Sequence, residues 1–363
     1  MKIPFTDLQS EYRECKWQID EAIQHCLSTN SFLTGPDVAE FEQVFSDYTG
    51  SEDCASCASG TAALQLALRA CGIGKRDEVI TVSYTFVSTV EAICSVGAKP
   101  VFVDVNKHGL ININQIESAI TERTKAVVWV DLYGQSPDIN QILKLCKTHR
   151  LYSIQDAAQS FGYEYKNRRI GGLADITCFS FNPVKNLGAI GDAGCVTGRA
   201  DLVALARSYA HHGRDKERVY QRIGYNLRID NVQAKVIQAK LPKLKGWLKR
   251  KNEIGDYYTE RFQKDYIVPK QMAWGKHTYY VYVIQTPKGT RDNLQAFLQE
   301  KGIATNIHYK HPTHITKAFQ DGTKLPITEY VCDNILSLPC YHSLPEHHQD
   351  YIIKAVKEFY GKN

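Results

Sequence analysis

The sequence lacks any hydrophobic run that could cross a membrane and has only a small excess of charge of one sign. No stretch of about 18 apolar residues occurs in the 363-residue chain, and its start, Met1 to Asp7, shows no apolar leader. The net charge of +5 is too small and too dispersed to indicate nucleic-acid binding. We therefore expect a cytoplasmic protein with neither a membrane nor a nucleic acid as partner.

Disulfide and metal signatures are also missing. The 11 cysteines are odd in number and scattered, which predicts reduced thiols. Cys54 and Cys57 have redox spacing, but they fall in a predicted buried strand without the second cysteine pair that zinc needs. The doublets His211-His212 and His347-His348 lack the i, i+4 spacing of a helical metal pair. We predict no metal site.

What is present is an alternation of short apolar runs with helical patterns. Such alternation predicts a parallel sheet with crossover helices and ligands beyond the carboxyl ends of the strands. The predicted strands are residues 54–58, 78–82, 100–105, 125–131, 151–156, 175–181 and 194–197, and predicted helices include 61–71, 85–96 and 139–148.

A chain of this length predicts two domains. Residues 231–263 look continuously helical apart from Pro242 and Gly246, and this bridge is a plausible boundary. The pattern after it, with residues 278–286, a helix over 291–301 and the run 304–309, predicts a smaller α+β domain. We place the domains at residues 1–245 and 246–363. The basic run 240–251 holds six Lys or Arg and no acid, a pattern typical of a solvated helical face.

Two strand-to-helix steps could contact a ligand. The Ser59-Gly60-Thr61 turn would present free backbone N–H groups to a phosphate, although many ordinary turns use Gly and Ser. The segment Ser83 to Thr89 could stack an aromatic ring on a flat cofactor, although an aromatic there is more often part of the core.

The pairing of Lys185 with Asp156 is the most informative feature. Asp156 ends an apolar strand, where it could hydrogen-bond a pyridine nitrogen or cap a helix starting at Ala157. Lys185 stands in residues 180–194, a stretch with only one other charge, Asp192, and could form a Schiff base. Ser180 could donate its hydroxyl to a phosphate. Together these residue types indicate a pyridoxal phosphate (PLP) site.

These segments resemble the DegT/DnrJ/StrS family of PLP-dependent nucleotide-sugar aminotransferases along essentially the whole chain. The resemblance implies PLP fold type I, like aspartate aminotransferase: an α/β large domain with a mostly parallel sheet and a smaller α+β C-terminal domain. The motifs that carry it are Ile3-Pro-Phe-Thr-Asp-Leu8, Phe32-Leu-Thr-Gly-Pro36, Ser59-Gly60-Thr61, Tyr84-Thr-Phe86, Asp156-Ala-Ala-Gln159, Ser180-Phe-Asn-Pro-Val-Lys185, residues 224–230, Ile307-His-Tyr309 and Leu336-Ser-Leu-Pro339.

The resemblance also implies a role for each matching residue. Lys185 would be the Schiff-base lysine and Asp156 the partner of the pyridine nitrogen. The other cofactor contacts would be Gln159 at the ring hydroxyl, Phe86 stacked on the ring, and Gly60, Thr61 and Ser180 at the phosphate. Asn226 would reach the phosphate from the other subunit of a homodimer with shared active sites. His308, Tyr309 and Arg228 would approach the substrate.

The implied reaction takes an amino group from L-glutamate, leaving 2-oxoglutarate, and delivers it to a nucleotide-linked keto sugar in deoxyamino-sugar biosynthesis, as for lipopolysaccharide O-antigen. Lys185 favours transamination, because relatives that dehydrate sugars carry histidine there. Residues 186–194 and Ile307-His-Tyr309 resemble enzymes that aminate C3 of a dTDP-linked 6-deoxyhexose. Gln155, where Glu is frequent, and Lys310, where Pro is frequent, depart from the pattern. The alternatives are a C4 enzyme, a UDP-linked substrate, or a non-catalytic sensor of sugar nucleotides.

Overall fold

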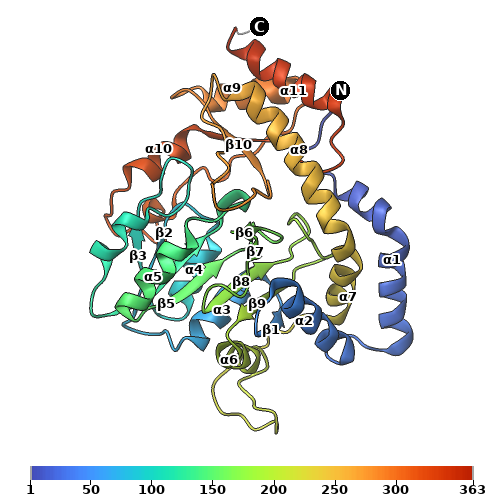
Figure 1. Ribbon diagram of the computed structural model, residues 1–363, viewed down its shortest axis with the longest axis vertical. Helices are drawn as coiled ribbons and strands as arrows, with labels where there is room; N and C mark the ends of the chain where they lie inside the picture. Colours follow the sequence, from blue (N-terminus) through green and yellow to red (C-terminus); the bar gives the residue numbers. More distant parts are fainter. Residues whose placement is uncertain (1, 362–363) are drawn as a thin grey trace.

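A seven-stranded sheet forms the centre of the larger part of the protein (Figure 1). The computed structural model describes residues 2–361. From β3 to β8 all neighbouring strands are parallel, whereas β9 is antiparallel to both β8 and β1, so the predicted mostly parallel α/β sheet is confirmed. In spatial order the strands are β1 (Asp53–Cys57), β9 (Gly194–Gly198), β8 (Ile176–Ser180), β5 (Tyr152–Asp156), β4 (Thr124–Val130), β2 (Glu78–Val82) and β3 (Lys99–Val103).

The reversal of β9 follows from the way the chain leaves β8. A parallel neighbour requires a crossover connection, usually a helix. Residues 181–193 contain no helix and instead fold back, with Phe181 N donating to Ala193 O (2.8 Å) and Ala189 N to Phe181 O (2.8 Å). This return holds Lys185 beside the carboxyl end of β8.

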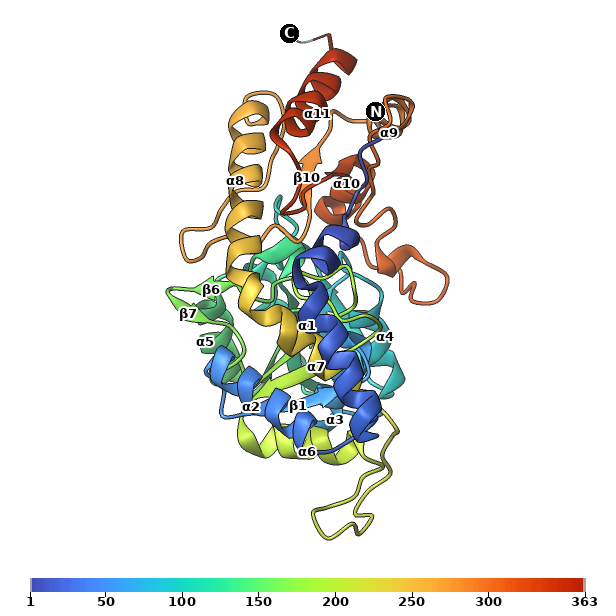
Figure 2. The same cartoon turned by 90° about the vertical axis from the view of Figure 1, so that its right-hand side faces the viewer.

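Helices cover both faces of the sheet, as Figures 1 and 2 show. Strands β2, β8 and β9 are buried along their whole length because both faces are covered. One face packs against α3 (Gly60–Ala70), α4 (Ser88–Ser95) and α6 (Ala200–Ala210). The other packs against α2 (Pro36–Thr49), α5 (Ile139–His149) and α7 (Asn231–Lys240), and α1 (Leu8–Thr29) lies on α7.

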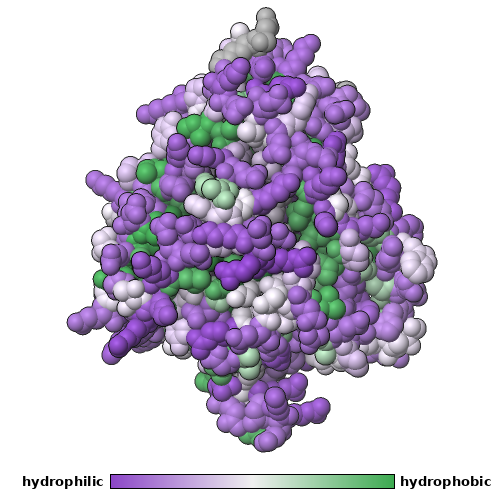
Figure 3. All heavy atoms as spheres, viewed as in Figure 1, coloured by the Kyte–Doolittle hydropathy of each residue, from purple (hydrophilic) through white to green (hydrophobic). Residues whose placement is uncertain are grey.

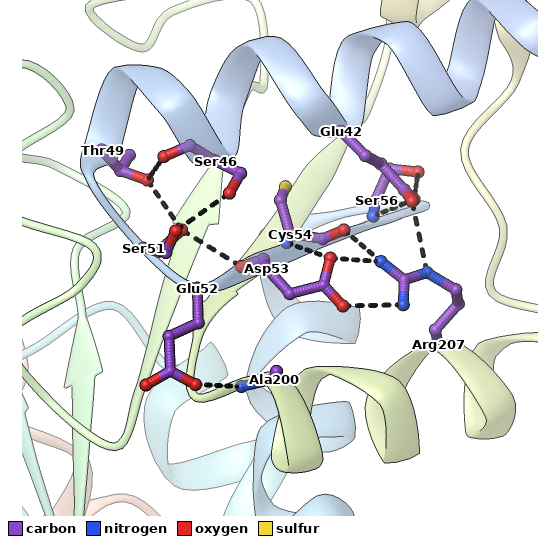
Figure 4. A network of polar contacts seen from close by, with 10 residues as sticks. All are labelled: Glu42, Ser46, Thr49, Ser51, Glu52, Asp53, Cys54, Ser56, Ala200 and Arg207. Atoms are coloured by element: carbon purple, nitrogen blue, oxygen red, sulfur yellow. Dashed lines mark hydrogen bonds and ion pairs between the residues drawn. The ribbon is translucent and has the colours of Figure 1, made fainter.

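A polar network fixes strand β1 between two helices (Figure 4). Arg207 of α6 donates through both terminal nitrogens to Asp53 (2.8 and 2.9 Å) and through Nε to Glu42 of α2 (3.2 Å). Glu42 also accepts from the backbone N and the hydroxyl of Ser56 (2.8 and 2.7 Å). The network holds the strand that leads directly into the Ser59-Gly60 turn.

The C-terminal part has a core of its own. Ile254 and Tyr258 of α8 (Leu244–Phe262) pack with Leu336 and with residues of the last helix, and Ile3 joins them from the N-terminus. The remaining elements here are β10 (Tyr282–Gln285), α9 (Arg291–Glu300), α10 (Pro326–Asn334), β11 (Ile335–Leu338) and α11 (Glu346–Phe359). The boundary at 245/246 stays a prediction.

The minor elements complete the described chain. They are the hairpin β6 (Glu164–Tyr165) and β7 (Arg168–Arg169) and the 3-10 segments η1 (Ile113–Gln115), η2 (Glu117–Ala119), η3 (Leu132–Gly134), η4 (Leu241–Lys243) and η5 (Thr313–Ile315). Within residues 2–361, no helix combines the length and apolarity that a membrane span requires.

Two expected elements differ from the observed ones. The helix expected over 231–263 is divided by η4 at Pro242 into α7 and α8. The run 304–309 forms no strand and makes only an isolated bridge between Asn306 and Ser337.

Candidate functional site

A cavity of about 630 Å³ lies at the carboxyl ends of the parallel strands. Nine of the eleven site residues predicted from the sequence line it: Gly60, Thr61, Phe86, Asp156, Gln159, Ser180, Lys185, His308 and Tyr309. Strands β1, β2, β5 and β8 deliver seven of these from separate stretches of the chain, as expected for a sheet whose parallel strands end at one edge.

The N-terminus of α3 forms one end of the cavity. Ser59 caps this helix by accepting from Ala62 N (3.1 Å), so the amides of Gly60 and Thr61 are left for an anion. The Thr61 hydroxyl lies 2.7 Å from Ser88 Oγ, and both residues line the cavity. A Cβ on Gly60 would lie 2.6 Å from Ser180 Cβ, so the close approach of α3 to β8 requires glycine. This end presents hydroxyl and amide donors to a phosphate.

Asp156 is the buried carboxylate of the cavity. It is 4% exposed, and its oxygens accept separately from Thr89 Oγ1 (2.7 Å) and Ala158 N (3.2 Å). Burial raises the pKa of Asp156, while these hydrogen bonds and the charge of Lys185 oppose that rise. Residues 158–162 form turns, so Asp156 caps a turn and the helix considered at Ala157 is absent. Thr89 lies in the segment 83–89, which the sequence pattern identifies as a possible ligand contact. Its hydroxyl is the feature of the sequence that could have indicated this role.

Phe86 is not a core residue. Its side chain is 53% exposed and lines the cavity, with its ring centre 6.0 Å from that of Tyr309. The Tyr309 hydroxyl accepts from Gln159 Nε2 (2.8 Å), and Gln159 Oε1 accepts from Tyr133 N (2.8 Å). The exposed ring of Phe86 and the fixed amide of Gln159 therefore line the same cavity.

Lys185 is held by its own loop and by a ring from the C-terminal part. Its backbone N donates to Asn182 O (2.9 Å), and Asn182 Nδ2 donates to Asp192 Oδ1 (2.9 Å) across the loop. The ammonium nitrogen lies 4.4 Å from the centre of the Tyr280 ring. Nothing in the sequence around Tyr280 signals this contact.

His308 is anchored by side chains distant in sequence. Tyr84 and Tyr133 each donate a hydroxyl to His308 O (2.8 and 2.5 Å), which replaces the strand pairing expected for this run. The His308 ring contacts Ser337 Oγ through Nδ1 (2.9 Å). Burial, together with the charge of Lys185, lowers the pKa of His308 to about 4, so the ring is neutral at pH 7.

Asn226 and Arg228 do not line this cavity within the described part of the chain. They lie close together, with Arg228 Nε donating to Asn226 Oδ1 (3.0 Å), at the end of a segment that follows α6. Figures 1 and 2 both show this segment projecting from the body of the protein. Its apolar side chains are strongly exposed: Tyr220 by 73% and Ile223 by 93%.

The cavity fits PLP by its donors and acceptors. The α3 end suits the phosphate, Phe86 the ring face, Asp156 the ring nitrogen and Lys185 the aldehyde. Within residues 2–361, no group of three His, Cys, Asp or Glu side chains is arranged to hold a metal ion.

A Gly60→Ala substitution tests the phosphate end. We expect PLP affinity to fall about 10- to 100-fold, because relieving a clash of this kind typically costs 1–3 kcal/mol. The matched control is Gly246→Ala in α8, where a Cβ meets nothing within 4 Å and affinity should not change. Fluorescence titration of the apoprotein with PLP measures both, and equal affinity in the two variants would contradict the assignment.

Comparison with known proteins gives a consistent result. Residues 14–357 match the DegT/DnrJ/EryC1/StrS aminotransferase family. The chain is 38% identical to an Acidithiobacillus ferrooxidans UDP-N-acetyl-3-dehydro-alpha-D-glucosamine 3-aminotransferase (95% of this chain, 94% of that protein) and 36% identical to a Micromonospora megalomicea dTDP-3-amino-3,4,6-trideoxy-alpha-D-glucose transaminase (96% of each). It is also 36% identical to a Geobacillus stearothermophilus pleiotropic regulatory protein (99% of each).

Solved structures share the whole fold. A DegT/DnrJ/EryC1/StrS aminotransferase from Brucella abortus superposes with a TM-score of 0.95 at 35% identity, covering 99% of this chain and 100% of that one. A Bacillus subtilis protein solved with its bound PMP cofactor gives 0.93 at 27% identity, covering 99% and 86%.

Proposed function

The chain belongs to the DegT/DnrJ/EryC1/StrS aminotransferase family of PLP-dependent enzymes, and from that premise we propose that it moves the amino group of L-glutamate onto the C3 keto group of a nucleotide-linked hexose. The observation that carries the proposal is the meeting of Lys185 and Asp156 in one cavity with the open ring of Phe86. The PLP cofactor, when bound, supplies an aldehyde that bonds to amines and a ring that withdraws electrons from the attached carbon.

The residues of this chain then have distinct tasks. Lys185 Nζ accepts and returns the proton at the reacting carbon, which is the general acid–base part of the transfer. Asp156 holds positive charge at the ring nitrogen, while Phe86 and Gln159 orient the ring. Gly60, Thr61 and Ser180 bind the phosphate. His308 and Tyr309, which also line the cavity, orient the sugar.

We further propose dTDP as the nucleotide and a 6-deoxyhexose as the sugar. Among the lining residues described, Lys185 is the one lysine or arginine, and the carboxylates Asp156 and Asp192 line the same cavity. A sugar with an uncharged methyl at C6 needs no further cation, whereas a uronate would. Relatives named for dTDP- and UDP-linked sugars have similar identities to this chain, 36% and 38%, and both are named for amination at C3.

A substrate panel tests this assignment. The holoenzyme is incubated with glutamate and with dTDP- or UDP-linked 3-keto and 4-keto sugars, and the aminated products are detected by mass. We expect the dTDP-linked 3-keto-6-deoxyhexose to exceed the others in kcat/KM by at least about 100-fold, because a misplaced carbonyl leaves buried polar groups unpaired. Preference for a UDP-linked or 4-keto sugar would refute the substrate part only.

A homodimer with shared sites accounts for Asn226. The segment 211–230 carries five Lys or Arg against three acids, and its exposed Tyr220 and Ile223 would be covered by a second copy. We propose that Asn226 binds the cofactor phosphate of the partner's cavity and that Arg228 approaches the diphosphate of the partner's substrate.

Mixed dimers test the shared site. Lys185→Ala and Asn226→Asp chains should each be nearly inactive alone, the second because a carboxylate would repel the phosphate. Co-expressed with different tags and purified as the heterodimer, they should regain roughly half the turnover of a wild-type dimer, since one of two symmetric sites is then intact. No recovery would place Asn226 in its own chain's site, and an Asn226→Asp chain that is active alone would place Asn226 outside the site.

The rival function is a non-catalytic sensor that keeps the fold and binds a sugar nucleotide. The pleiotropic regulatory protein among the relatives keeps this candidate open. A holoenzyme that converts no glutamate while retaining bound cofactor would favour it.

A further inference from the structure

A second cavity of about 410 Å³ shares no lining residue with the site described above. It lies between the β6–β7 hairpin and the start of α8, beside residues 276–278. Figure 3, in the orientation of Figure 1, shows an apolar strip along this flank of α8 with hydrophilic side chains on both sides. Volumes of this size are typical of small-molecule sites.

The rim of this cavity carries an excess of positive charge. Lys245 and Lys249, one helical turn apart in α8, and Lys276 all line it. In the described range 2–361, none of the three has a hydrogen bond or ion pair to another side chain. Arg169 also lines the cavity, 3.9 Å from the one lining carboxylate, Glu164. The basic run 240–251 is therefore not simply a solvated face. Two of its lysines, Lys245 and Lys249, line one cavity together with Lys276.

The wall of the cavity combines apolar surface with two buried polar groups. Leu241, Leu244 and Leu248 supply the apolar part. Asn252 is 4% exposed, and its Oδ1 has no hydrogen-bond partner in the described structure. His277 is 1% exposed and accepts from Tyr279 N through Nδ1 (2.9 Å), so the neutral ring carries its proton on Nε2, which is also unpartnered. Both polar atoms have almost no accessible surface, so the leucines form the part of the wall that a ligand would contact.

We propose that this cavity is a second nucleotide site that binds a nucleoside diphosphate. The three lysines match the charge of a diphosphate, since lysine binds phosphate as a mobile point charge. The leucine wall suits the flat base. The site stands apart from the catalytic cavity, so occupancy can report nucleotide level without competing with substrate.

Lysine footprinting of the wild-type holoenzyme tests the proposal without a variant that could misfold. Acetylation rates are measured by mass spectrometry with and without dTDP or UDP. At a nucleotide concentration roughly ten times the Kd, we expect acetylation of Lys245, Lys249 and Lys276 to slow about tenfold, in proportion to the free fraction. Lys264 and Lys288, which line neither cavity, are the internal controls. Unchanged acetylation of the three lysines would overturn the proposal.

Two further arms identify the ligand and the site. Pyrophosphate should protect the lysines at least tenfold less well than dTDP, and equal protection would refute the role of the base. Calorimetry of the holoenzyme with dTDP should find two sites per chain. The Lys245→Gln/Lys249→Gln/Lys276→Gln variant should keep only the catalytic one, whereas Lys264→Gln/Lys288→Gln should keep both. Retention of both sites in the triple variant would contradict the assignment.

Discussion

Lys185→Ala should abolish turnover and remove the yellow colour of the purified protein. Lys185 is the one lysine among the described residues that line the catalytic cavity, so no other amine on that cavity can take its place. Proton transfer by a positioned side chain is worth about 10²- to 10⁴-fold, and loss of the covalent link to the cofactor adds to this. We expect a decrease in kcat of at least about 10⁴-fold, measured with glutamate and the keto sugar.

The control for this experiment is Lys264→Ala. Lys264 lies outside both cavities, so colour and kcat should equal those of the wild type. A circular dichroism spectrum and a Tm near the wild-type values would show that the Lys185 variant is folded. Retained turnover in Lys185→Ala would reject the assignment of this lysine.

Asp156→Asn should have the second largest effect. The substitution keeps the shape of the side chain and removes its charge, so the ring nitrogen loses the buried anion that keeps it protonated. Removing one preorganised electrostatic contact in such a site costs about 2.7–4 kcal/mol, so we expect kcat to fall about 10²- to 10³-fold. Steady-state kinetics should show the loss in kcat rather than in KM.

Thr89→Val provides a graded comparison. It removes the hydroxyl that donates to Asp156 Oδ2 (2.7 Å) and leaves the carboxylate in place. A hydrogen bond to a charged group is worth about 1.5–3 kcal/mol, so the decrease should be roughly 10- to 100-fold. If Thr89→Val were more damaging than Asp156→Asn, the carboxylate would not be the group that acts on the cofactor.

The features predictable from the sequence are those that depend on local pattern. Strand ends can be read from apolar runs, and parallel strands bring their carboxyl ends together, and Asp156, Ser180 and Gly60 do line one cavity. The glycine turn and the charge-poor loop around Lys185 have distinctive compositions. The physical constraints on the turn and the loop act over a few neighbouring residues, so the sequence alone indicates both.

The features that escaped prediction depend on contacts between distant segments. The Tyr84 and Tyr133 hydroxyls both reach His308 O, and Tyr280 lies beside Lys185. No spacing rule encodes such contacts, because they arise only when the C-terminal part packs on the sheet. The reversed β9 is similar: a short apolar run does not show its direction. Asn226 is expected at the phosphate of the other subunit's cavity, and the mixed-dimer experiment tests that role.

The central claim is the transfer of nitrogen from glutamate to C3 of the sugar, and isotope tracing tests it most directly. The holoenzyme is incubated with ¹⁵N-labelled L-glutamate and the dTDP-linked 3-keto-6-deoxyhexose, and the product is examined by NMR. We predict ¹⁵N bonded to C3 and the formation of one 2-oxoglutarate for each amino sugar. A product with nitrogen at C4, or a sugar recovered without ¹⁵N while the cofactor remains bound, would contradict this account.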